Sequence, residues 1–307
     1  MTDSVTDCKT CKECNNEYYE YGWCNNCYAK RFQQDFENWT SGNDVVDKFI
    51  QGNQLKATSF TTFIEWIPFE KFKDVTYLSK GGFGSVSKAV WPEGYIIGWN
   101  KELIRIPNVN VCLKRLDNSA NISPEFLQEV QNQLKLRATS ATVPVYGLSR
   151  DPVSNDYVIV TSYSEYQSLR DMTVKSYDKF DCHTKMKDLF YLTKCLSEIH
   201  EAGLVHGNLH PGNVICYGKA NLCLSDLGLN KPASDKRPTA KELVNAYDQW
   251  NTSKVCYDYG ETTELHYQIE ETKLLYMKQE YPIYDSANVK VHPQALYTSR
   301  PLSIHSS

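Results

Sequence analysis

The sequence has no long hydrophobic run and no excess of either charge. No apolar stretch approaches the roughly 18 residues that span a membrane. Residues 1–7 are acidic, whereas a signal peptide begins with basic residues and continues with apolar ones. The net charge of −4 gives no electrostatic basis for binding bulk nucleic acid or an anionic membrane. We therefore expect an intracellular, cytoplasmic protein with no membrane or nucleic-acid partner.

Internal repeats are also absent, and the composition is otherwise ordinary. The chain of 307 residues is 41% hydrophobic and 23% charged, which is typical of a soluble globular protein. At about 150 residues per domain, this length predicts about two domains and a sizeable core.

Cysteine is comparatively frequent, with eleven in the chain. In a reducing compartment these thiols need an explanation other than disulfide bonds. Six lie scattered from Cys112 to Cys256, which is typical of small buried side chains. Four of the others form two CxxC pairs separated by nine residues: Cys11, Cys14, Cys24 and Cys27. Paired turns of this kind present four thiolates to one tetrahedral ion, so we predict a structural zinc ribbon over residues 1–28.

Alternatives to this zinc site remain open. Cys8 forms a further CxxC pair with Cys11 and is a spare candidate ligand. The thiols are otherwise free, or one pair is a redox motif, although the βαβ setting of such motifs is missing. Because a closed four-cysteine site has no open coordination position, we expect it to fold the segment and not to catalyse.

A helical segment is predicted to follow the cysteines. Phe32, Phe36 and Trp39 recur at helical spacing within residues 29–65, which we interpret as a helical linker. A second helix is predicted to start at Asn43. Its expected apolar face comprises Val45, Phe49 and Leu55.

The centre of the chain alternates between β-rich and helical patterns. Four runs predict strands: residues 75–78, 86–91, 109–116 and 157–163. Residues 124–137 predict a helix with Ser123 as its N-cap and with an apolar face formed by Phe126, Val130 and Leu134. A longer helix around residues 186–199 is expected to end near Gly203.

The character of the chain changes after residue 230. A capping box at residues 238–242 predicts one more helix. Residues 251–307 are polar and rich in tyrosine, and we expect a poorly ordered tail with one helix around residues 270–278.

A glycine-rich run follows the first predicted strand. Residues 78–86 read LSKGGFGSV. This run resembles the glycine-rich loop of protein kinases, a tight turn whose backbone amides cover nucleotide phosphates. A plain hairpin is the alternative interpretation of this run in isolation.

Charged and polar residues follow at characteristic distances. Lys114 ends the β-rich run VCLK, and Glu129 lies on the next predicted helix. Taken alone, both are interpreted equally well as solvated surface charges. Residues 204–214 read LVHGNLHPGNV, and residues 225–229 read SDLGL.

In this order and spacing, the motifs resemble the glycine-rich loop, the lysine strand, the catalytic loop and the D-F-G segment of eukaryotic protein kinases. The resemblance covers residues 66–250. It implies an α+β, bilobal fold with a five-stranded antiparallel N-lobe at residues 66–164 and an incomplete C-lobe at residues 165–250. Together with Arg31-Phe32-Gln33-Gln34, the ribbon also looks like that of a large fungal group of tyrosine-kinase-like kinases.

The resemblance also implies ATP and magnesium as cofactors. Lys114 would grip the α- and β-phosphates, Glu129 would orient Lys114, and Asn213 and Asp226 would hold magnesium. Asn208 occupies the position of the catalytic base. The residues implied to contact nucleotide are Ser79, Gly81, Gly82, Phe83, Gly84, Val86, Cys112, Lys114, Thr161, Tyr163, Asn213, Ile215 and Asp226.

Two departures from the family pattern bear on catalysis. Asn208 stands where the family has an aspartate, and Gly207 replaces the preceding arginine. A neutral amide cannot accept the proton of a substrate hydroxyl, and loss of a general base typically costs about 10²–10⁴ in rate. Only ten residues separate Asp226 from Arg237, where the family has its activation segment, its A-P-E element and several helices. The C-lobe is therefore expected to be internally truncated.

These observations favour a pseudokinase that binds Mg-ATP and acts in signalling through binding. One alternative is an active serine/threonine or tyrosine kinase. Another is a truncated or mis-spliced gene product without a function of its own. An extra exon after Ser234 in the full-length transcript would restore the active-kinase interpretation. The protein partner or substrate is not encoded in any motif of the sequence.

Overall fold

The structure of the chain is a computed structural model. It describes residues 10–11, 13–16, 23–80, 84–100, 102–117, 119–120, 122, 124–139, 141–165, 168–176, 182–217 and 222–227. The described residues form two compact units, divided between Glu165 and Tyr166. We call them the N-terminal unit and the C-terminal unit and describe each by itself.

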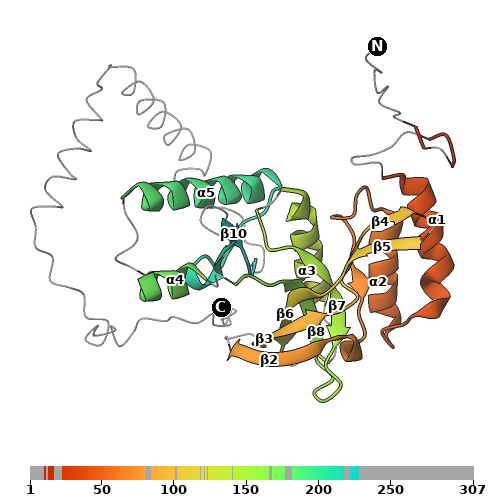
Figure 1. Cartoon of the computed structure of the whole chain (residues 1–307), viewed down its shortest axis with the longest axis horizontal. Helices are drawn as coiled ribbons and strands as arrows, with labels where there is room; N and C mark the ends of the chain where they lie inside the picture. The colour runs from red at the N-terminus through yellow and green to blue at the C-terminus, as the bar shows by residue number, and fades with distance from the viewer. Residues whose placement is uncertain are drawn as a thin grey trace, which may run out of the picture. The chain divides into compact units, whose positions relative to one another are not determined.

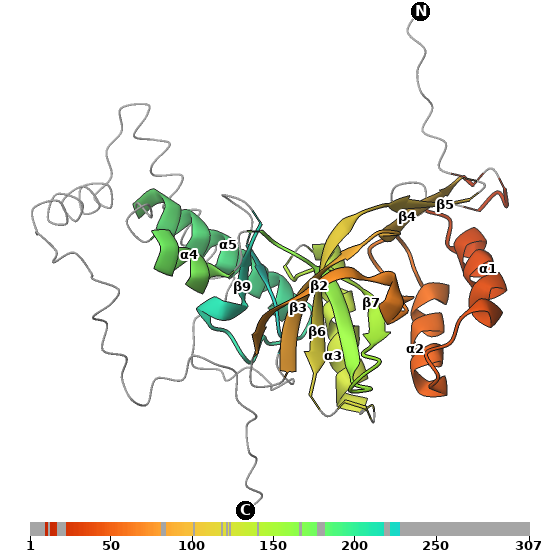
Figure 2. The same cartoon turned by 60° about the horizontal axis from the view of Figure 1, so that its bottom comes forward.

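A six-stranded sheet lies at the centre of the N-terminal unit (Figures 1 and 2). Its strand order is β1-β7-β8-β6-β3-β2. The bounds are Glu65–Trp66 for β1, Lys73–Lys80 for β2, Gly84–Trp91 for β3, Val109–Leu116 for β6, Val145–Arg150 for β7 and Tyr157–Ser162 for β8. Five strands pair in antiparallel fashion, which confirms the expected five-stranded sheet. The two-residue strand β1 extends it by pairing parallel to β7.

The two faces of this sheet carry separate hydrophobic clusters, as the alternation of side chains along a strand requires. On one face, Val111 and Leu113 of β6 pack with Trp91 and Val158. The other face is covered by helix α3, Pro124–Leu136, which is followed by the 3-10 turn η4, Arg137–Thr139. The predicted apolar face of α3 is confirmed, because all three of its residues are buried: Phe126, Val130 and Leu134.

A hairpin that the sequence analysis did not predict is inserted between β3 and β6. Its strands are β4, Tyr95–Asn100, and β5, Glu102–Ile106. They form a separate two-stranded antiparallel sheet. Figure 2 shows the hairpin extending from the main sheet toward helix α1.

Helices α1, Asn25–Asp35, and α2, Asp44–Leu55, precede the sheet, with the 3-10 turn η2, Phe36–Asn38, between them. The predicted start of α2 is confirmed, since the Asn43 side chain accepts hydrogen bonds from the first-turn amides of Val45 and Val46. The predicted apolar face of α2 was wrong in part. Val45 is 56% exposed, whereas Val46 and Ile50 are fully buried. Two adjacent apolar ridges run along this helix, and packing against the rest of the unit selects the second.

The segment interpreted as a helical linker contributes to the core of the N-terminal unit. Tyr28 and Phe32 of α1 cluster with Trp23, with Phe63 and with Ile96 of the inserted hairpin. The 3-10 turn η3, Phe69–Lys71, follows this segment and precedes β2.

A buried ion pair adds a second link to the inserted hairpin. The guanidinium group of Arg105 donates hydrogen bonds to the carboxylate of Glu65 and to the carbonyl oxygen of Gly94. Burial raises the pKa of Glu65, and the positive charge of Arg105 opposes that rise. The ion pair therefore joins β1 to β5 inside the unit.

The described part of the C-terminal unit contains a long helix and a small sheet. Its elements are α4, Leu169–Ser176, α5, Cys182–Glu201, η6, Pro211–Asn213, β9, Val214–Cys216, and β10, Leu222–Leu224. Helix α5 ends as predicted near Gly203, which has a φ of +73°. Cys195 and Ile199 of α5 are buried, and the Cys195 thiol donates to the carbonyl oxygen of Leu222. The helices predicted after residue 230 lie outside the described residues, as does Ser123.

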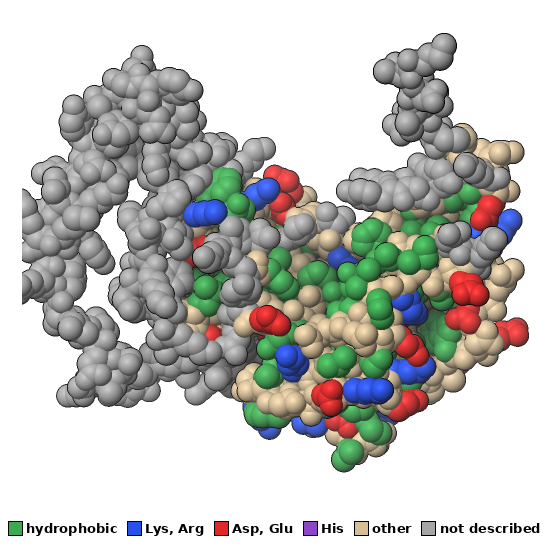
Figure 3. All heavy atoms as spheres, viewed as in Figure 1, with side chains coloured by type: hydrophobic (Ala, Val, Ile, Leu, Met, Phe, Trp, Pro, Cys, Tyr) green, Lys and Arg blue, Asp and Glu red, His purple; other side chains and the backbone are tan. Residues whose placement is uncertain are grey.

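Figure 3 shows acidic and basic groups intermingled on the face of the N-terminal unit that it views. Among the described helices, none combines the length and the apolar character that crossing a membrane requires.

Candidate functional site

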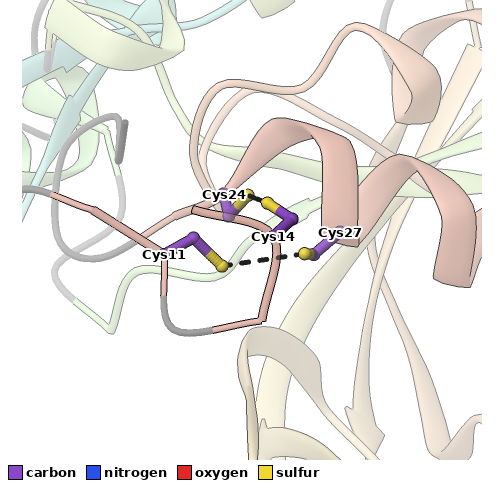
Figure 4. A group of neighbouring side chains, drawn as sticks. All are labelled: Cys11, Cys14, Cys24 and Cys27. Atoms are coloured by element: carbon purple, nitrogen blue, oxygen red, sulfur yellow. Dashed lines mark hydrogen bonds between the residues drawn. The ribbon is translucent and has the colours of Figure 1, made fainter. Parts of the chain in front are cut away.

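The four cysteines of the predicted ribbon converge on one point (Figure 4). Their Sγ atoms all lie within 4.8 Å of one another. The Cys11 and Cys27 sulfurs are 3.7 Å apart, and those of Cys14 and Cys24 are 3.4 Å apart. Cys24 and Cys27 come from the start of α1, whereas the other two come from the preceding loop.

The chemistry of this cluster fits a structural zinc ion. Zinc–sulfur bonds of about 2.3 Å place the sulfurs of a tetrahedral site a little under 4 Å apart, close to the two pair distances in the cluster. Burial raises the pKa of Cys24 and of Cys27. Burial acts in the same direction on Cys11, but hydrogen bonds from the backbone at Glu13 and Cys14 and with the neighbouring cysteine side chains together lower that pKa to about 7. A bound cation would compensate the cost of holding four thiolates in this buried place.

The cysteine cluster is tied to the inserted hairpin by Arg31. The Arg31 guanidinium group donates to the Glu13 carboxylate at 2.6 Å, beside the first cysteine pair. The same group lies 4.8 Å from the ring centre of Trp99 on β4 and 5.5 Å from that of Tyr28. The sequence analysis missed this contact because the hairpin that supplies Trp99 was not predicted. Cys8, the spare candidate ligand, lies outside the described residues.

Lys114 and Glu129 meet within the N-terminal unit. The Lys114 ammonium lies 3.6 Å from the Glu129 carboxylate, and the two side chains are 17% and 22% exposed. Strand β6 carries the lysine and helix α3 carries the glutamate. The Gln133 amide donates to the same carboxylate at 3.4 Å. The carboxylate is therefore held from its own helix as well as by the lysine.

Several residues expected around the nucleotide share one face of the sheet with Lys114. Residues paired across antiparallel strands point to the same side. Val86 of β3 pairs with Lys114, and Cys112 of β6 pairs with Thr161 of β8. Burial raises the pKa of the Cys112 thiol to about 11, so this thiol is neutral at physiological pH.

Two further residues expected around the nucleotide lie at the borders of the sheet face that carries Lys114. Ser79 of β2 pairs with Val86 at the glycine-rich turn. Tyr163 follows β8, and the Lys88 ammonium lies 4.5 Å from the centre of its ring. The sequence analysis did not single out Lys88, whose place on this face follows from its pairing with Cys112.

The glycine-rich turn is described at its two ends. Gly81, Gly82 and Phe83, at its tip, lie outside the described residues. Gly84 begins β3, where a Cβ atom would collide with the carbonyl oxygen of Arg115 on β6. Glycine is therefore required at position 84 by close approach of two backbones.

The catalytic-loop residues of the C-terminal unit are joined by hydrogen bonds. The Asn213 side-chain amide donates to the carbonyl oxygen of Asn208 at 2.9 Å. The backbone amide of Asn208 donates to Nδ1 of His206 at 3.4 Å. Burial lowers the pKa of His206, which is 3% exposed. Gly207 has a φ of +71°, a conformation that glycine adopts without strain.

The same loop is bonded to the segment that carries Asp226. The Ser225 amide donates to the Asn213 carbonyl oxygen at 2.9 Å. Asp226 has a φ of +57°, which is unusual for a residue other than glycine. Ile215 of β9 pairs with Cys223 of β10. The structure therefore brings Asn208, Asn213 and Asp226 into one hydrogen-bonded pair of loops.

Comparisons with known proteins agree with these motifs. Residues 65–259 match the sequence model of the protein tyrosine and serine/threonine kinase family, which is more than half of the chain. A receptor-like serine/threonine-protein kinase of Arabidopsis thaliana is 23% identical over 244 residues, covering 76% of this chain and 33% of the relative. Kinase suppressor of Ras B of Caenorhabditis elegans is 25% identical over 198 residues, covering 62% and 34%.

The family is therefore established, at the level of the domain. The melanoma receptor tyrosine-protein kinase of Xiphophorus maculatus is 25% identical over 189 residues, covering 61% of this chain and 15% of the relative. The chain thus spans a third or less of the length of most of these curated relatives. The α+β content and the β-sheet N-lobe expected from the sequence are confirmed. The chain belongs to the protein tyrosine and serine/threonine kinase family.

Proposed function

We propose that this chain is a pseudokinase that binds Mg-ATP and acts in signalling by binding a protein partner. The proposal is based on a contrast between two sites of the chain. The Lys114–Glu129 ion pair is present at 3.6 Å, whereas an asparagine occupies the position of the catalytic base. The phosphate-gripping pair survives without the group that would accept the substrate proton.

Binding of nucleotide is supported by the residues that share the Lys114 face. Val86, Cys112 and Thr161 give that face small or apolar side chains suited to a purine base. Lys114, oriented by Glu129, would hold the phosphates, and Asn213 with Asp226 would hold magnesium. When bound, the metal neutralises phosphate charge. The chain's own contribution is to orient these side chains.

Transfer of the phosphate is disfavoured by residue 208. The Asn208 amide carries no basic lone pair that could accept the substrate proton. Loss of this base would raise the activation free energy of transfer by roughly 3–5 kcal/mol. The truncation after Asp226 removes the segment on which family members seat a peptide, as judged from the sequence. The residues that follow Leu227 lie outside the described part of the chain.

The same proposal includes the domain boundaries, the zinc ligands and the kinase subclass. We assign residues 1–28 to a zinc ribbon, with Cys11, Cys14, Cys24 and Cys27 as ligands of a structural ion. The kinase-like domain occupies residues 66–250, preceded by the helical segment 29–65 and followed by the tail 251–307. We further propose that the chain is related to tyrosine-kinase-like kinases of the fungal type, because the four cysteines and Arg31-Phe32-Gln33-Gln34 resemble their N-terminal ribbon.

Mg-ATP binding is tested by calorimetric titration of the full chain. Wild type is expected to bind, and Lys114→Ala to bind at least about tenfold more weakly because a phosphate contact is lost. Equal heats in both proteins would refute a specific site.

Phosphoryl transfer is tested with radiolabelled ATP, a generic protein substrate and the same chain as substrate. Wild type and Asn208→Asp are both expected to remain at the background set by Lys114→Ala. If the missing base were the only defect, Asn208→Asp would recover part of its share of about 10²–10⁴. Lys114-dependent transfer by wild type would instead establish the second candidate function, an active kinase.

A further inference from the structure

Helix α2 shares a hydrophobic cluster with the helix that carries Glu129. Val46 and Ile50 of α2 are both 0% exposed. They belong to the same hydrophobic cluster as Phe126 and Val130 of α3, together with residues of β7 and β8. In Figure 2, α2 and α3 lie on the same side of the sheet. The N-terminal segment therefore supplies one wall of the core on which α3 rests.

The Glu129 carboxylate has little freedom once α3 is fixed. Glu129 stands between Phe126 and Val130, which are 7% and 0% exposed. A helix moves as a rigid body, so a shift of these two anchors displaces the carboxylate by a similar distance. The Lys114–Glu129 separation is already 3.6 Å, close to the limit of an ion pair, so a further ångström would break the pair.

Helix α2 is itself held at both ends. The Asp47 carboxylate accepts hydrogen bonds from the Ser41 amide and from the Thr40 hydroxyl, at 2.8 and 2.6 Å. At the other end, the Gln54 side chain donates to the Ile64 carbonyl oxygen at 3.1 Å, just before β1. The helix is therefore a fixed support and not a loosely attached extension.

We propose that Val46 and Ile50 are positioning residues: through α3 they hold Glu129 against Lys114, so that the N-terminal segment sets the affinity for nucleotide. This inference rests on the proposed function for its effect on Mg-ATP. The placement of α3 by α2 does not depend on nucleotide and can be tested without it.

The first experiment measures the Mg-ATP dissociation constant of the full chain by calorimetry. Val46→Ala is expected to weaken binding at least about fivefold, the lower end of typical coupling between sites. The matched control is Val158→Ala, which removes the same atoms from a residue 1% exposed in the cluster on the opposite sheet face. The control is expected to bind like wild type.

A double-mutant cycle separates positioning from general damage. In a Glu129→Gln background, Val46→Ala is expected to cause no additional loss of affinity, because the pair that it acts through is already gone. An equal loss in both backgrounds, or an equal loss in Val158→Ala, would overturn the inference.

The second experiment uses the nucleotide-free chain. Amide hydrogen exchange within α3 is expected to be at least about tenfold faster in Val46→Ala than in Val158→Ala. Unchanged exchange would overturn the inference whatever the nucleotide result. If wild type fails to bind Mg-ATP but α3 responds as expected, the proposed function fails and the positioning role stands.

A milder pair of variants covers the case in which Val46→Ala does not fold. Ile50→Val removes one methyl group from α2, and Ile67→Val removes one from the opposite cluster, where Ile67 is 2% exposed. Faster exchange of α3 in Ile50→Val alone supports the inference. Equal exchange in the two variants contradicts it.

Discussion

The two units differ in how firmly they hold the residues that the kinase pattern needs. In the N-terminal unit, Lys114 lies on the third strand from the sheet edge and Glu129 on a helix packed over that sheet. In the described part of the C-terminal unit, Asn208 and Asp226 lie on loops beside two strands of three residues each. The N-terminal unit holds the ion pair that we propose binds phosphate, and the C-terminal unit carries Asn208, at the proposed position of the catalytic base. If the proposed function is correct, the scaffold for binding has persisted while the residues for transfer have changed.

Tryptophan provides a way to follow the first unit separately. Five of the six tryptophans lie before residue 165: Trp23, Trp39, Trp66, Trp91 and Trp99. Their fluorescence reports mainly on the N-terminal unit, while hydrogen exchange in α5 reports on the C-terminal unit. Together these two signals show whether the units respond independently.

Removal of zinc is expected to have the largest effect, and only on the N-terminal unit. Apparent binding energies of structural zinc sites are about 10–16 kcal/mol, so Cys24→Ser or chelation should unfold the segment around Trp23. The Trp23 ring stacks on Tyr28 at 3.6 Å, and its exposure should shift the emission to longer wavelength. Exchange in α5 should not change.

The control for the zinc prediction is Cys223→Ser, a half-buried cysteine in the C-terminal unit. It should leave tryptophan emission and zinc content as in wild type. Elemental analysis that finds no zinc in the purified protein would contradict the prediction outright.

Loss of the Glu65 charge is expected to have the next largest effect. Glu65→Gln leaves the Arg105 guanidinium group in a largely buried place without its counter-charge, which costs about 3 kcal/mol or more. The measurement is urea unfolding followed by tryptophan fluorescence. Glu13→Gln, which removes the exposed partner of Arg31, should cost less than about 1 kcal/mol. Equal losses would show that the Glu65 pair is screened by solvent.

Two glycine substitutions should give small effects of opposite sign in the two units. Gly207→Ala forces a side chain into a φ of +71° and should destabilise its loop by about 1–2 kcal/mol. Gly52→Ala lies inside α2, where an added Cβ meets nothing within 4 Å, and should stabilise the helix by about 0.5–1 kcal/mol. Exchange within residues 204–217 measures the first, and urea unfolding measures the second. A loss of stability in Gly52→Ala would contradict the packing described for α2.

The sequence predicts local features well and long-range packing poorly. Helix α3 was predicted with its correct face, because a single apolar ridge fits the helical period. Helix α2 has two such ridges, and the buried one is selected by α3 and the sheet, which local periodicity cannot reveal. The inserted hairpin was missed for the same reason: its buried residue Ile96 packs on Trp23 and Tyr28, more than sixty residues earlier.

Ion pairs show the same difference between what motifs predict and what only the fold reveals. Lys114 and Glu129 were predicted as a pair because the kinase pattern fixes a lysine strand followed by a glutamate helix. The Glu65–Arg105 pair was not predicted, since no motif links residues forty positions apart on β1 and the hairpin. Motif spacing reveals the residues that a family shares, and only the fold reveals those that this chain adds.

Strand β2 has a consequence for how the protein behaves in solution. It forms one edge of the sheet, and Val75 and Tyr77 on it are 46% and 62% exposed. An apolar edge strand invites a strand from another molecule to pair with it and start aggregation. Here two register shifts distort the edge, and Lys73 and Lys80 place a charge at each end. Acylation or charge reversal of these two lysines should therefore be the first change that causes the protein to self-associate.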